Sequence, residues 1–294
     1  MSLFPQAGPG GRRSGIDLHC HSLASDGRLS PTEVVARAAG QGVQVLALTD
    51  HDTVAGVPEA ARAAEIHGIQ LVPGVECSCQ WQGRELHVVG LGIDPDAEVL
   101  QDLMSTARSA RWQRLRRMSA KLVSRRVDGI LARVEALVGE GMPTRAHVAR
   151  AMLEAGHVTT LQQAFDRYIG HGKPAWVRPE WPDMDDTLAA IRAAGGQAVL
   201  AHPLAYRMTG AWLRRTLQAF RAAGGEAVEV VCGSSDRQAI LTATGQALRA
   251  ELKGSIGSDF HGPENPWIEL GQLHPLPAAV TPVWADWPQV AGLE

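Results

Sequence analysis

The chain has 294 residues, of which 45% are hydrophobic, and it carries a formal net charge of −3 with a pI near 6.4. This apolar content is sufficient for a large buried core and excludes a disordered chain. The slightly acidic balance argues against a broad surface that coats nucleic acid, although a local basic pocket stays compatible with it.

The sequence contains four cysteines: Cys20, Cys77, Cys79 and Cys232. Their spacing matches no zinc ribbon, and two of them are too close in sequence for an ordinary disulfide. We therefore expect free thiols and a reducing, cytoplasmic compartment. No apolar run reaches the length of a membrane span, and residues 1–14, rich in Gly and Pro, are expected to form a flexible tail.

The first hundred residues alternate between strand and helix patterns. Apolar runs at 15–19, 43–52, 69–76 and 85–93 predict strands, and helical patterns cover 30–42 and 56–68. The first helix has Ser30 as its N-cap, Pro31 in its first turn and Glu33 at the capping-box position. Continuous Val, Ile and Leu runs between helices indicate a parallel sheet that is covered on both faces.

The pattern then changes. From about Pro95 to Pro179 it is almost wholly helical, and after it three segments repeat a helix, a glycine and a strand. We interpret this as an α/β barrel interrupted by a helical insertion. Residues 15–95 and 180–294 are predicted to form the catalytic barrel, and residues 96–179 an inserted substrate-binding domain.

Potential metal ligands lie at the predicted strand ends. They are His19, His21, Asp26, His51, Glu76, His87, His202, Asp259 and His261. Because the carboxyl ends of parallel strands meet on one face of an α/β barrel, these nine side chains can converge. Their burial without bound cations would carry a large desolvation cost. Mixed imidazole and carboxylate donors favour Mn²⁺, Fe²⁺ or Zn²⁺ in a polynuclear site over a structural zinc.

Each of these residues has a simpler interpretation when taken alone. His87 lies in an apolar run and is typical of a satisfied core histidine, and Glu76 or Asp259 could cap a following helix. The metal interpretation depends on their coincidence, because six of the eleven histidines fall at strand ends.

Several neighbours of these residues are expected to play structural parts. Asp50 and Asp52 flank His51 and are expected to orient it or to cap a helix. Cys20 should point away from the site because strand side chains alternate.

The run 108–126 carries eight basic residues and no acidic one. It could form an RNA-binding ridge or a solvated helix face. A helical stripe through Trp112, Leu115, Met118 and Leu122 favours the helix face, with one or two arginines at the mouth of a pocket.

Six motifs in order resemble those of the PHP (polymerase and histidinol phosphatase) superfamily, from Ile16 to about His261. They are DLHCHSLASDG, LALTDHDTVAG, VPGVECS, HVVGLGID, LAHP and GSDFH. The similarity is strongest to the stand-alone PHP phosphoesterases, which include nucleoside 3′,5′-bisphosphate phosphatases and 5′–3′ exoribonucleases of the RNase AM type.

The resemblance implies an α/β fold, a distorted seven-stranded (β/α) TIM-like barrel, that holds three divalent metal ions, often Mn²⁺. By motif, one metal would be held by His19, His21, Glu76 and Asp259. Glu76 would bridge to a second metal, which His87 and His202 also bind, and a third would be held by Asp26, His51 and His261. A metal-activated hydroxide held by Glu76, His202 and Asp259 would be the nucleophile.

Four further residues are predicted to bind substrate phosphate. Arg145 follows Pro143 and Thr144 at the predicted start of a helix, where anions are favoured. Lys173 lies in a loop flanked by glycines, and both stretches resemble phosphate-contacting segments of the family. His147 is a weaker candidate. The family motif His-Pro-Gly-Arg-Tyr reads HPLAYR in this chain, so Arg207 would replace the arginine from a shifted position.

These features predict a metal-dependent hydrolase that removes the 3′-phosphate of nucleoside 3′,5′-bisphosphates. The alternative is a 5′–3′ exoribonuclease that acts on short 5′-phosphorylated RNA. A histidinol phosphatase, or an inert PHP module like those in replicative polymerases, is a more distant alternative. The expected partner is a small phosphorylated nucleotide or a short RNA, with no membrane and no long nucleic acid.

Overall fold

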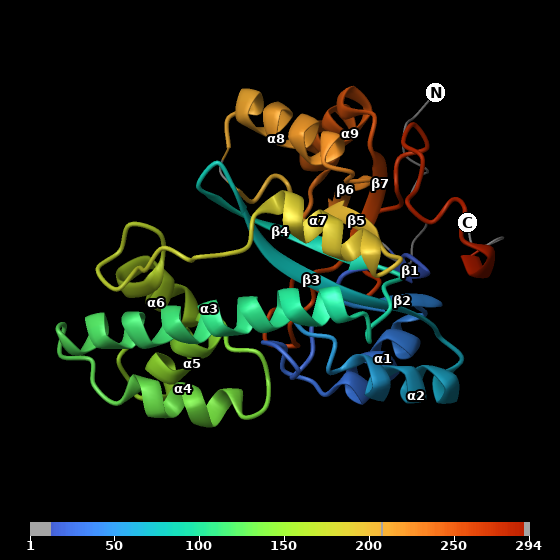
Figure 1. Ribbon diagram of the computed structural model, residues 1–294. Coiled ribbons are helices and arrows are strands. Elements are labelled where there is room, and N and C mark those ends of the chain that lie inside the picture. Colours follow the sequence, from blue (N-terminus) through green and yellow to red (C-terminus); the bar gives the residue numbers. More distant parts are fainter. Residues whose placement is uncertain (1–12, 207, 291–294) are drawn as a thin grey trace.

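The computed structural model describes residues 13–206 and 208–290 (Figure 1). The predicted tail lies outside the described residues except for Arg13 and Ser14, and so does Arg207. None of the helices in the described part of the chain is long and apolar enough to cross a membrane.

Seven strands form one sheet in which every strand pairs with its neighbour in sequence. They are β1 (Ile16–Asp17), β2 (Val45–Leu48), β3 (Gln70–Trp81), β4 (Arg84–Leu91), β5 (Gln197–Leu200), β6 (Ala227–Cys232) and β7 (Lys253–Gly257). The first and last strands meet, because the backbone N–H of Leu18 donates to the Ile256 carbonyl and Cys20 pairs with Phe260. This nearly closed barrel confirms the predicted TIM-like fold.

The prediction of a wholly parallel sheet is wrong at β4. This strand is antiparallel to both β3 and β5. The two residues that join β3 to β4, Gln82 and Gly83, both have positive φ angles, as a tight hairpin turn requires. In this register Ser78 pairs with His87, so His87 and Glu76 lie on the same face of the sheet. Glu76 therefore lies in the middle of a long strand and not at its end.

Five helices pack around the barrel: α1 (Pro31–Gln41), α2 (Val57–His67), α7 (Met184–Ala193), α8 (Gly210–Ala222) and α9 (Arg237–Ala250). The first begins with the predicted capping box, in which the side chains of Ser30 and Glu33 each accept a hydrogen bond from the other residue's backbone. Cys20 lies in the hydrophobic cluster that includes residues of α1 and α2, as strand alternation predicts.

The helical segment between β4 and α7 lies to one side of the barrel (Figure 1). It comprises α3 (Glu98–Val123), α4 (Ile130–Val138), α5 (Arg145–Glu154), α6 (Leu161–Ala164) and the π-helical turn η1 (Phe165–Ile169). A further short helix, η2 (Pro288–Val290), lies near the C-terminus. Leu115, Met118 and Leu122 of α3 are buried in a hydrophobic cluster of this segment. Leu100 and Met104, nearer the start of α3, belong instead to the cluster of the barrel, so the division at residues 96–179 stays a prediction.

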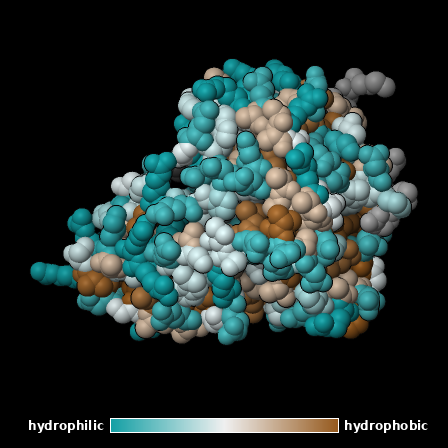
Figure 2. All heavy atoms as spheres, viewed as in Figure 1, coloured by the Kyte–Doolittle hydropathy of each residue, from teal (hydrophilic) through white to brown (hydrophobic). Residues whose placement is uncertain are grey.

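The outer surface is predominantly polar on the face shown in Figure 2, including the face of the helical segment. The stripe predicted along α3 packs inward, because Leu115, Met118 and Leu122 are buried and Trp112 is partly buried. Five of the eight basic residues in the run 108–126 are exposed. These exposed residues fit a solvated helix face, and the RNA-binding alternative for them stays a prediction.

Gly257, at the end of β7, has no room for a larger side chain. A Cβ there would lie 2.2 Å from the Cβ of His19. We expect Gly257→Ala to destabilise the protein by about 1–3 kcal/mol, the usual cost of overpacking. The midpoint of thermal unfolding should fall accordingly.

Gly40→Ala is the matched control, because a Cβ at Gly40 in α1 meets nothing within 4 Å. The gain in helix propensity should stabilise that variant by roughly 0.5–1 kcal/mol. Equal melting temperatures for the two variants would contradict the packing described here.

Candidate metal centre

The structure places all nine predicted metal ligands in one contiguous cluster at one end of the barrel. Every member has a nitrogen or carboxylate oxygen within 4 Å of such an atom of another member. The members come from β3, β4 and the segments that follow β1, β2, β5 and β7. The antiparallel turn of β4 is what brings His87 into this cluster.

The carboxylate of Glu76 lies at the centre and is fully buried. Burial alone would raise its pKa, but the surrounding imidazoles, led by His51, His19 and His87, hold that pKa well below the usual range. Five imidazole nitrogens approach its two oxygens: His51 Nδ1 at 2.8 Å, His87 Nδ1 and His202 Nε2 at 3.0 Å, His21 Nε2 at 3.3 Å and His19 Nε2 at 3.4 Å.

Several of these buried atoms are close together without being hydrogen-bonded. Glu76 Oε2 and His51 Nδ1 are 2.8 Å apart, yet neither has a hydrogen-bond partner among the described residues. Their lone pairs and N–H directions are thus not aligned with each other. Buried polar atoms that lack partners are costly, and a cation between them would remove that cost.

Three groups of donor atoms are compact enough to surround a metal ion, because the atoms within each group all lie within 4.8 Å of one another. They are His21, Asp26, His51 and His261; His19, His21 and Glu76; and His51, Glu76 and His87. Imidazole and carboxylate donors suit divalent transition metals. The cluster therefore supports binding of divalent metal ions.

Glu229, in the middle of β6, holds two cluster residues in place. The Nδ1–H of His19 donates to Glu229 Oε1 at 2.6 Å, and the backbone N–H of His202 donates to Glu229 Oε2 at 2.6 Å. The first bond leaves Nε2 of His19 free to face the cluster. Sequence reasoning missed this residue, although a lone acid inside an apolar strand was a usable signal.

The backbone is strained at the cluster. His202 and Asp259 have φ angles of 30° and 56°, a region that residues other than glycine seldom adopt. Such strain costs about 1–3 kcal/mol per residue and persists where the surrounding structure imposes it. The Asp259 N–H donates to the His19 carbonyl at 2.8 Å, which ties the two strand ends together.

Asp50 shapes the loop after β1 and does not contact the ring of His51, contrary to one expectation. Its carboxylate accepts from the backbone N–H of Ser22 at 2.7 Å and from the hydroxyls of Ser22 and Ser25, each at 2.6 Å. Burial raises the pKa of Asp50, and these three donors oppose that shift. The network positions the loop that carries Asp26.

The carboxylate of Asp52 likewise binds groups other than the ring of His51. Its carboxylate accepts from the Ser78 N–H at 2.7 Å and from Arg111 Nε at 2.7 Å. Arg111 comes from α3, so this buried ion pair joins the barrel to the helical segment.

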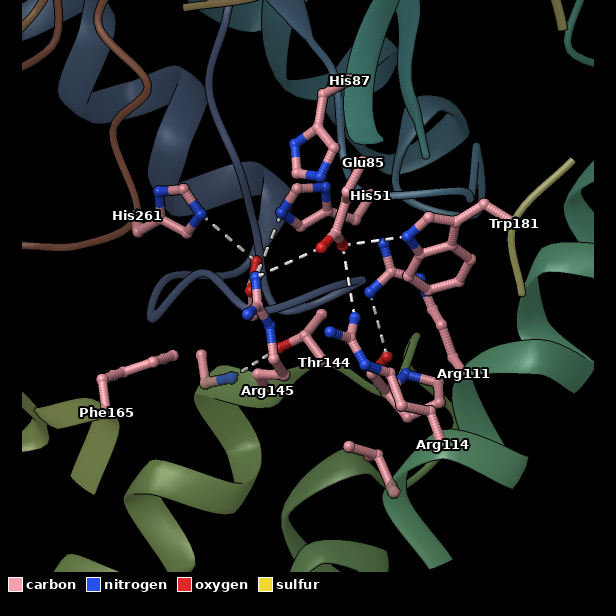
Figure 3. Close-up of a pocket in the computed structure, with 14 residues that line it drawn as sticks. His51, Glu85, His87, Arg111, Arg114, Thr144, Arg145, Phe165, Trp181 and His261 are labelled. Atoms are coloured by element: carbon pink, nitrogen blue, oxygen red, sulfur yellow. Dashed lines mark hydrogen bonds and ion pairs between the residues drawn. The ribbon is translucent and has the colours of Figure 1, made fainter. Parts of the chain in front are cut away.

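A cavity of about 240 Å³ lies between the cluster and the helical segment (Figure 3). His51, His87 and His261 line its barrel side, and three arginines face them from the helices: Arg111, Arg114 and Arg145. The sequence interpretation allowed for one or two arginines of the basic run at such a place, and Arg111 and Arg114 occupy it.

Glu85 is the acidic partner of these guanidinium groups. Arg114 lies 3.2 Å and Arg145 3.9 Å from its carboxylate, and Trp181 Nε1 donates to it at 2.9 Å. Burial would raise the pKa of Glu85, but Arg145 and Arg114 lower it to about 2. The cavity is thus lined by three arginines and by the carboxylates of Glu85 and Asp26, and Arg111 is also paired with Asp52.

The four predicted phosphate binders have different positions. Arg145 is the first residue of α5 and lines the cavity, as expected. His147 is buried and accepts a hydrogen bond from the Thr144 N–H at 3.1 Å, so it caps α5, and burial lowers its pKa to about 4. Lys173 is exposed in a turn and does not line the cavity. Arg207 lies outside the described residues.

Glu229→Gln keeps the shape of the side chain but removes the charge that orients His19. We expect it to weaken divalent metal binding about tenfold to a hundredfold, the usual effect of losing such an outer partner. Titration of Mn²⁺ against a competing chelator would measure this.

Glu226→Gln is the control for that substitution. Glu226 lies three residues earlier and accepts from Gln197, away from the cluster. Metal binding by the Glu226 variant should be unchanged. An equal loss of metal affinity in both variants would contradict a role of the Glu229–His19 hydrogen bond in metal binding.

Comparison with known proteins agrees with this arrangement. The family model for the PHP domain matches residues 17–198. The chain is 46% identical to a 5′–3′ exoribonuclease of Haemophilus influenzae, over 91% of this chain and 97% of the relative. It is 38% identical to a 3′,5′-nucleoside bisphosphate phosphatase of Chromobacterium violaceum, over 92% and 95%.

The fold is also similar to a solved structure of an amidohydrolase from Chromobacterium violaceum with bound sulfate and no metal. The TM-score is 0.87 at 39% identity, covering 92% of this chain and 95% of that one. The sequence motifs, the nearly closed seven-stranded barrel and the buried His/Glu/Asp cluster thus agree with the relatives. The chain belongs to the PHP domain family and is a hydrolase that acts on phosphate esters.

Proposed function

We propose that this hydrolase removes the 3′-phosphate of nucleoside 3′,5′-bisphosphates. The observation that carries the proposal is the cavity in which metal-binding residues face three arginines. Two separate anion sites suit a substrate with two phosphates, one at the metal cluster and one at the guanidinium groups. The bisphosphate phosphatase among the relatives supports this substrate class.

Three metal ions, Mn²⁺ or alternatively Fe²⁺ or Zn²⁺, would be held by the cluster. The proposed sets are His19, His21, Glu76 and Asp259; Glu76, His87 and His202; and Asp26, His51 and His261. Such ions polarise a phosphoryl group, activate water and neutralise charge on the leaving oxygen. The close contacts and unpartnered atoms around Glu76 support its place in two of the sets.

The protein's own contribution is to bind and orient the substrate. Arg145 lies in the first turn of α5, where the helix dipole and its guanidinium both favour an anion such as the 5′-phosphate. Glu85 holds Arg114 and Arg145 over the cavity before substrate binds. Water then adds to phosphorus and the bond to the 3′ oxygen breaks, which yields inorganic phosphate and a nucleoside 5′-monophosphate.

A 5′–3′ exoribonuclease is the second candidate, and the 46% identical relative favours it. The reaction differs only in what is attached to the far side of the 3′-phosphate. If another nucleotide is attached there, the same hydrolysis releases one mononucleotide from the 5′ end of an RNA. Both reactions need the 5′-phosphate at the arginines.

Release of phosphate from adenosine 3′,5′-bisphosphate in the presence of Mn²⁺ tests the proposal directly. A short 5′-phosphorylated oligoribonucleotide is assayed beside it, and His19→Ala and Asp259→Asn serve as inactive controls. Turnover of the first substrate supports the phosphatase, and stepwise mononucleotides from the second support the exoribonuclease. No turnover of either by the metal-loaded enzyme would refute the nucleotide assignment.

Arg145→Ala tests the arginine site. It should lower kcat/KM for adenosine 3′,5′-bisphosphate by about 10- to 100-fold, because a hydrogen bond to a charged group contributes about 1.5–3 kcal/mol. Hydrolysis of adenosine 3′-monophosphate, which lacks the 5′-phosphate, should change far less. Lys173→Ala is the matched control and should leave both values within about twofold, as exposed substitutions usually do. Equal losses on the two substrates would contradict a 5′-phosphate site at Arg145.

A further inference from the structure

A second, larger hollow adjoins the catalytic cavity and has no part in the mechanism above. It has a volume of about 730 Å³ and lies between the β3–β4 hairpin, the segment 171–181 and the region that leads into α8. We call it the hairpin groove. Its lining shares Glu85 and Trp181 with the catalytic cavity, so the two hollows are adjacent.

The hairpin groove also reaches the other side of the metal cluster. Tyr206 lines it, and its hydroxyl accepts from the His87 N–H at 3.0 Å and donates to the Ala201 carbonyl at 2.8 Å. The rings of Tyr206 and His202 are 5.3 Å apart. The groove therefore begins beside two candidate metal ligands.

We propose that the hairpin groove binds the nucleotides on the 3′ side of the scissile phosphodiester in short single-stranded RNA. This inference rests on the exoribonuclease form of the proposed function. When the 5′ nucleotide occupies the catalytic cavity with its 5′-phosphate at the arginines, the rest of the strand must leave past the cluster. The groove is the adjacent hollow into which it would pass.

The aromatic content of the groove suits unpaired bases. Trp176 is half-buried and lines it, and the exposed His171 ring lies 4.7 Å from that of Trp176. Trp212 also lines the groove, but its ring lies against the guanidinium groups of Arg84 and Arg215. Planar side chains that are partly open to solvent stack bases without regard to sequence. An exonuclease shortens RNA one nucleotide at a time, so a groove that holds the remaining strand must accept any base.

The charge of the groove suits phosphates. The guanidinium carbon of Arg84, which lines the groove, lies 4.5 Å from the ring centre of Trp212, and that of Arg215 lies 4.6 Å from the same ring. Arg178 reaches the tip of the hairpin and donates to the Gly83 carbonyl at 3.4 Å. Among the described lining residues Glu85 is the single carboxylate, and it is already engaged by Arg114 and Trp181.

Alternating cations and aromatic rings along a groove are the mark of single-stranded nucleic-acid sites. A protein partner would be expected to bury an apolar patch, whereas four of the groove's side chains are charged or imidazole groups: Arg84, Glu85, His171 and Arg178. The observations thus favour RNA as the occupant.

Binding of RNA to metal-free enzyme in EDTA separates this groove from catalysis. The probe is a 5′-phosphorylated oligoribonucleotide of six adenosines with a fluorescent 3′ end, and the readout is fluorescence anisotropy. The double variant Trp176→Ala/Arg178→Glu should bind this hexamer at least about tenfold more weakly than wild type, since one stacked base contributes about 1–3 kcal/mol. Arg178→Glu alone, which leaves the tryptophan in place, should show a smaller loss in the same direction.

Arg62→Glu is the matched control. Arg62 is an exposed arginine of α2, a helix that lies away from the β3–β4 hairpin in Figure 1, and it does not line the groove. Its replacement by Glu changes the net charge of the protein as much as Arg178→Glu does. Its affinity for the hexamer should stay within about twofold of wild type. Adenosine 3′,5′-bisphosphate, which ends at the scissile phosphate, should keep its kcat/KM in the groove variants.

Unchanged hexamer binding in the double variant, or wild-type binding of the hexamer no tighter than that of a dinucleotide, would overturn the proposal. So would an equal loss of bisphosphate turnover, because the substitutions would then act through the catalytic cavity. Failure of the proposed function is a separate result: wild type would turn over neither substrate with Mn²⁺, whatever the binding in EDTA.

Discussion

The buried carboxylate of Glu76 is the constraint on which the rest of the site depends. It has no contact with water and is approached by five imidazole nitrogens at 2.8–3.4 Å. Removing a charge from water costs several kcal/mol, and partners must compensate that cost. Hydrogen bonds cannot do so completely here, because Oε2 has no properly aligned donor. Divalent cations shared between these groups would supply the missing compensation.

The barrel and the helical segment contribute different chemistry. The barrel supplies the metal-binding cluster, and α3 and α5 supply the arginines that face it. The Asp52–Arg111 ion pair and the hydrogen bond from Arg150 to the Asp26 carbonyl fasten the two parts across the cavity. The candidate metal ligands and the arginines that face them therefore come from different parts of the chain.

The convergence of the cluster could be predicted because His19, His21 and Asp259 follow apolar strands whose ends meet in any α/β barrel. The reversal of β4 could not, because its apolar run is like that of a parallel strand and the turn Gln82–Gly83 is a weak signal. The sequence also could not predict which arginines of the basic run line the cavity. Which members of a run of eight cations face a cavity depends on how α3 is rotated against the barrel, and only packing decides that.

The central claim is that Glu76 holds more than one metal ion. The direct test is the Mn²⁺ content per chain of wild type and of Glu76→Gln, which keeps the shape of the side chain and removes its charge, measured after removal of free metal. We expect three ions in wild type and the loss of at least two in the folded variant. A folded variant that keeps the full complement would contradict it.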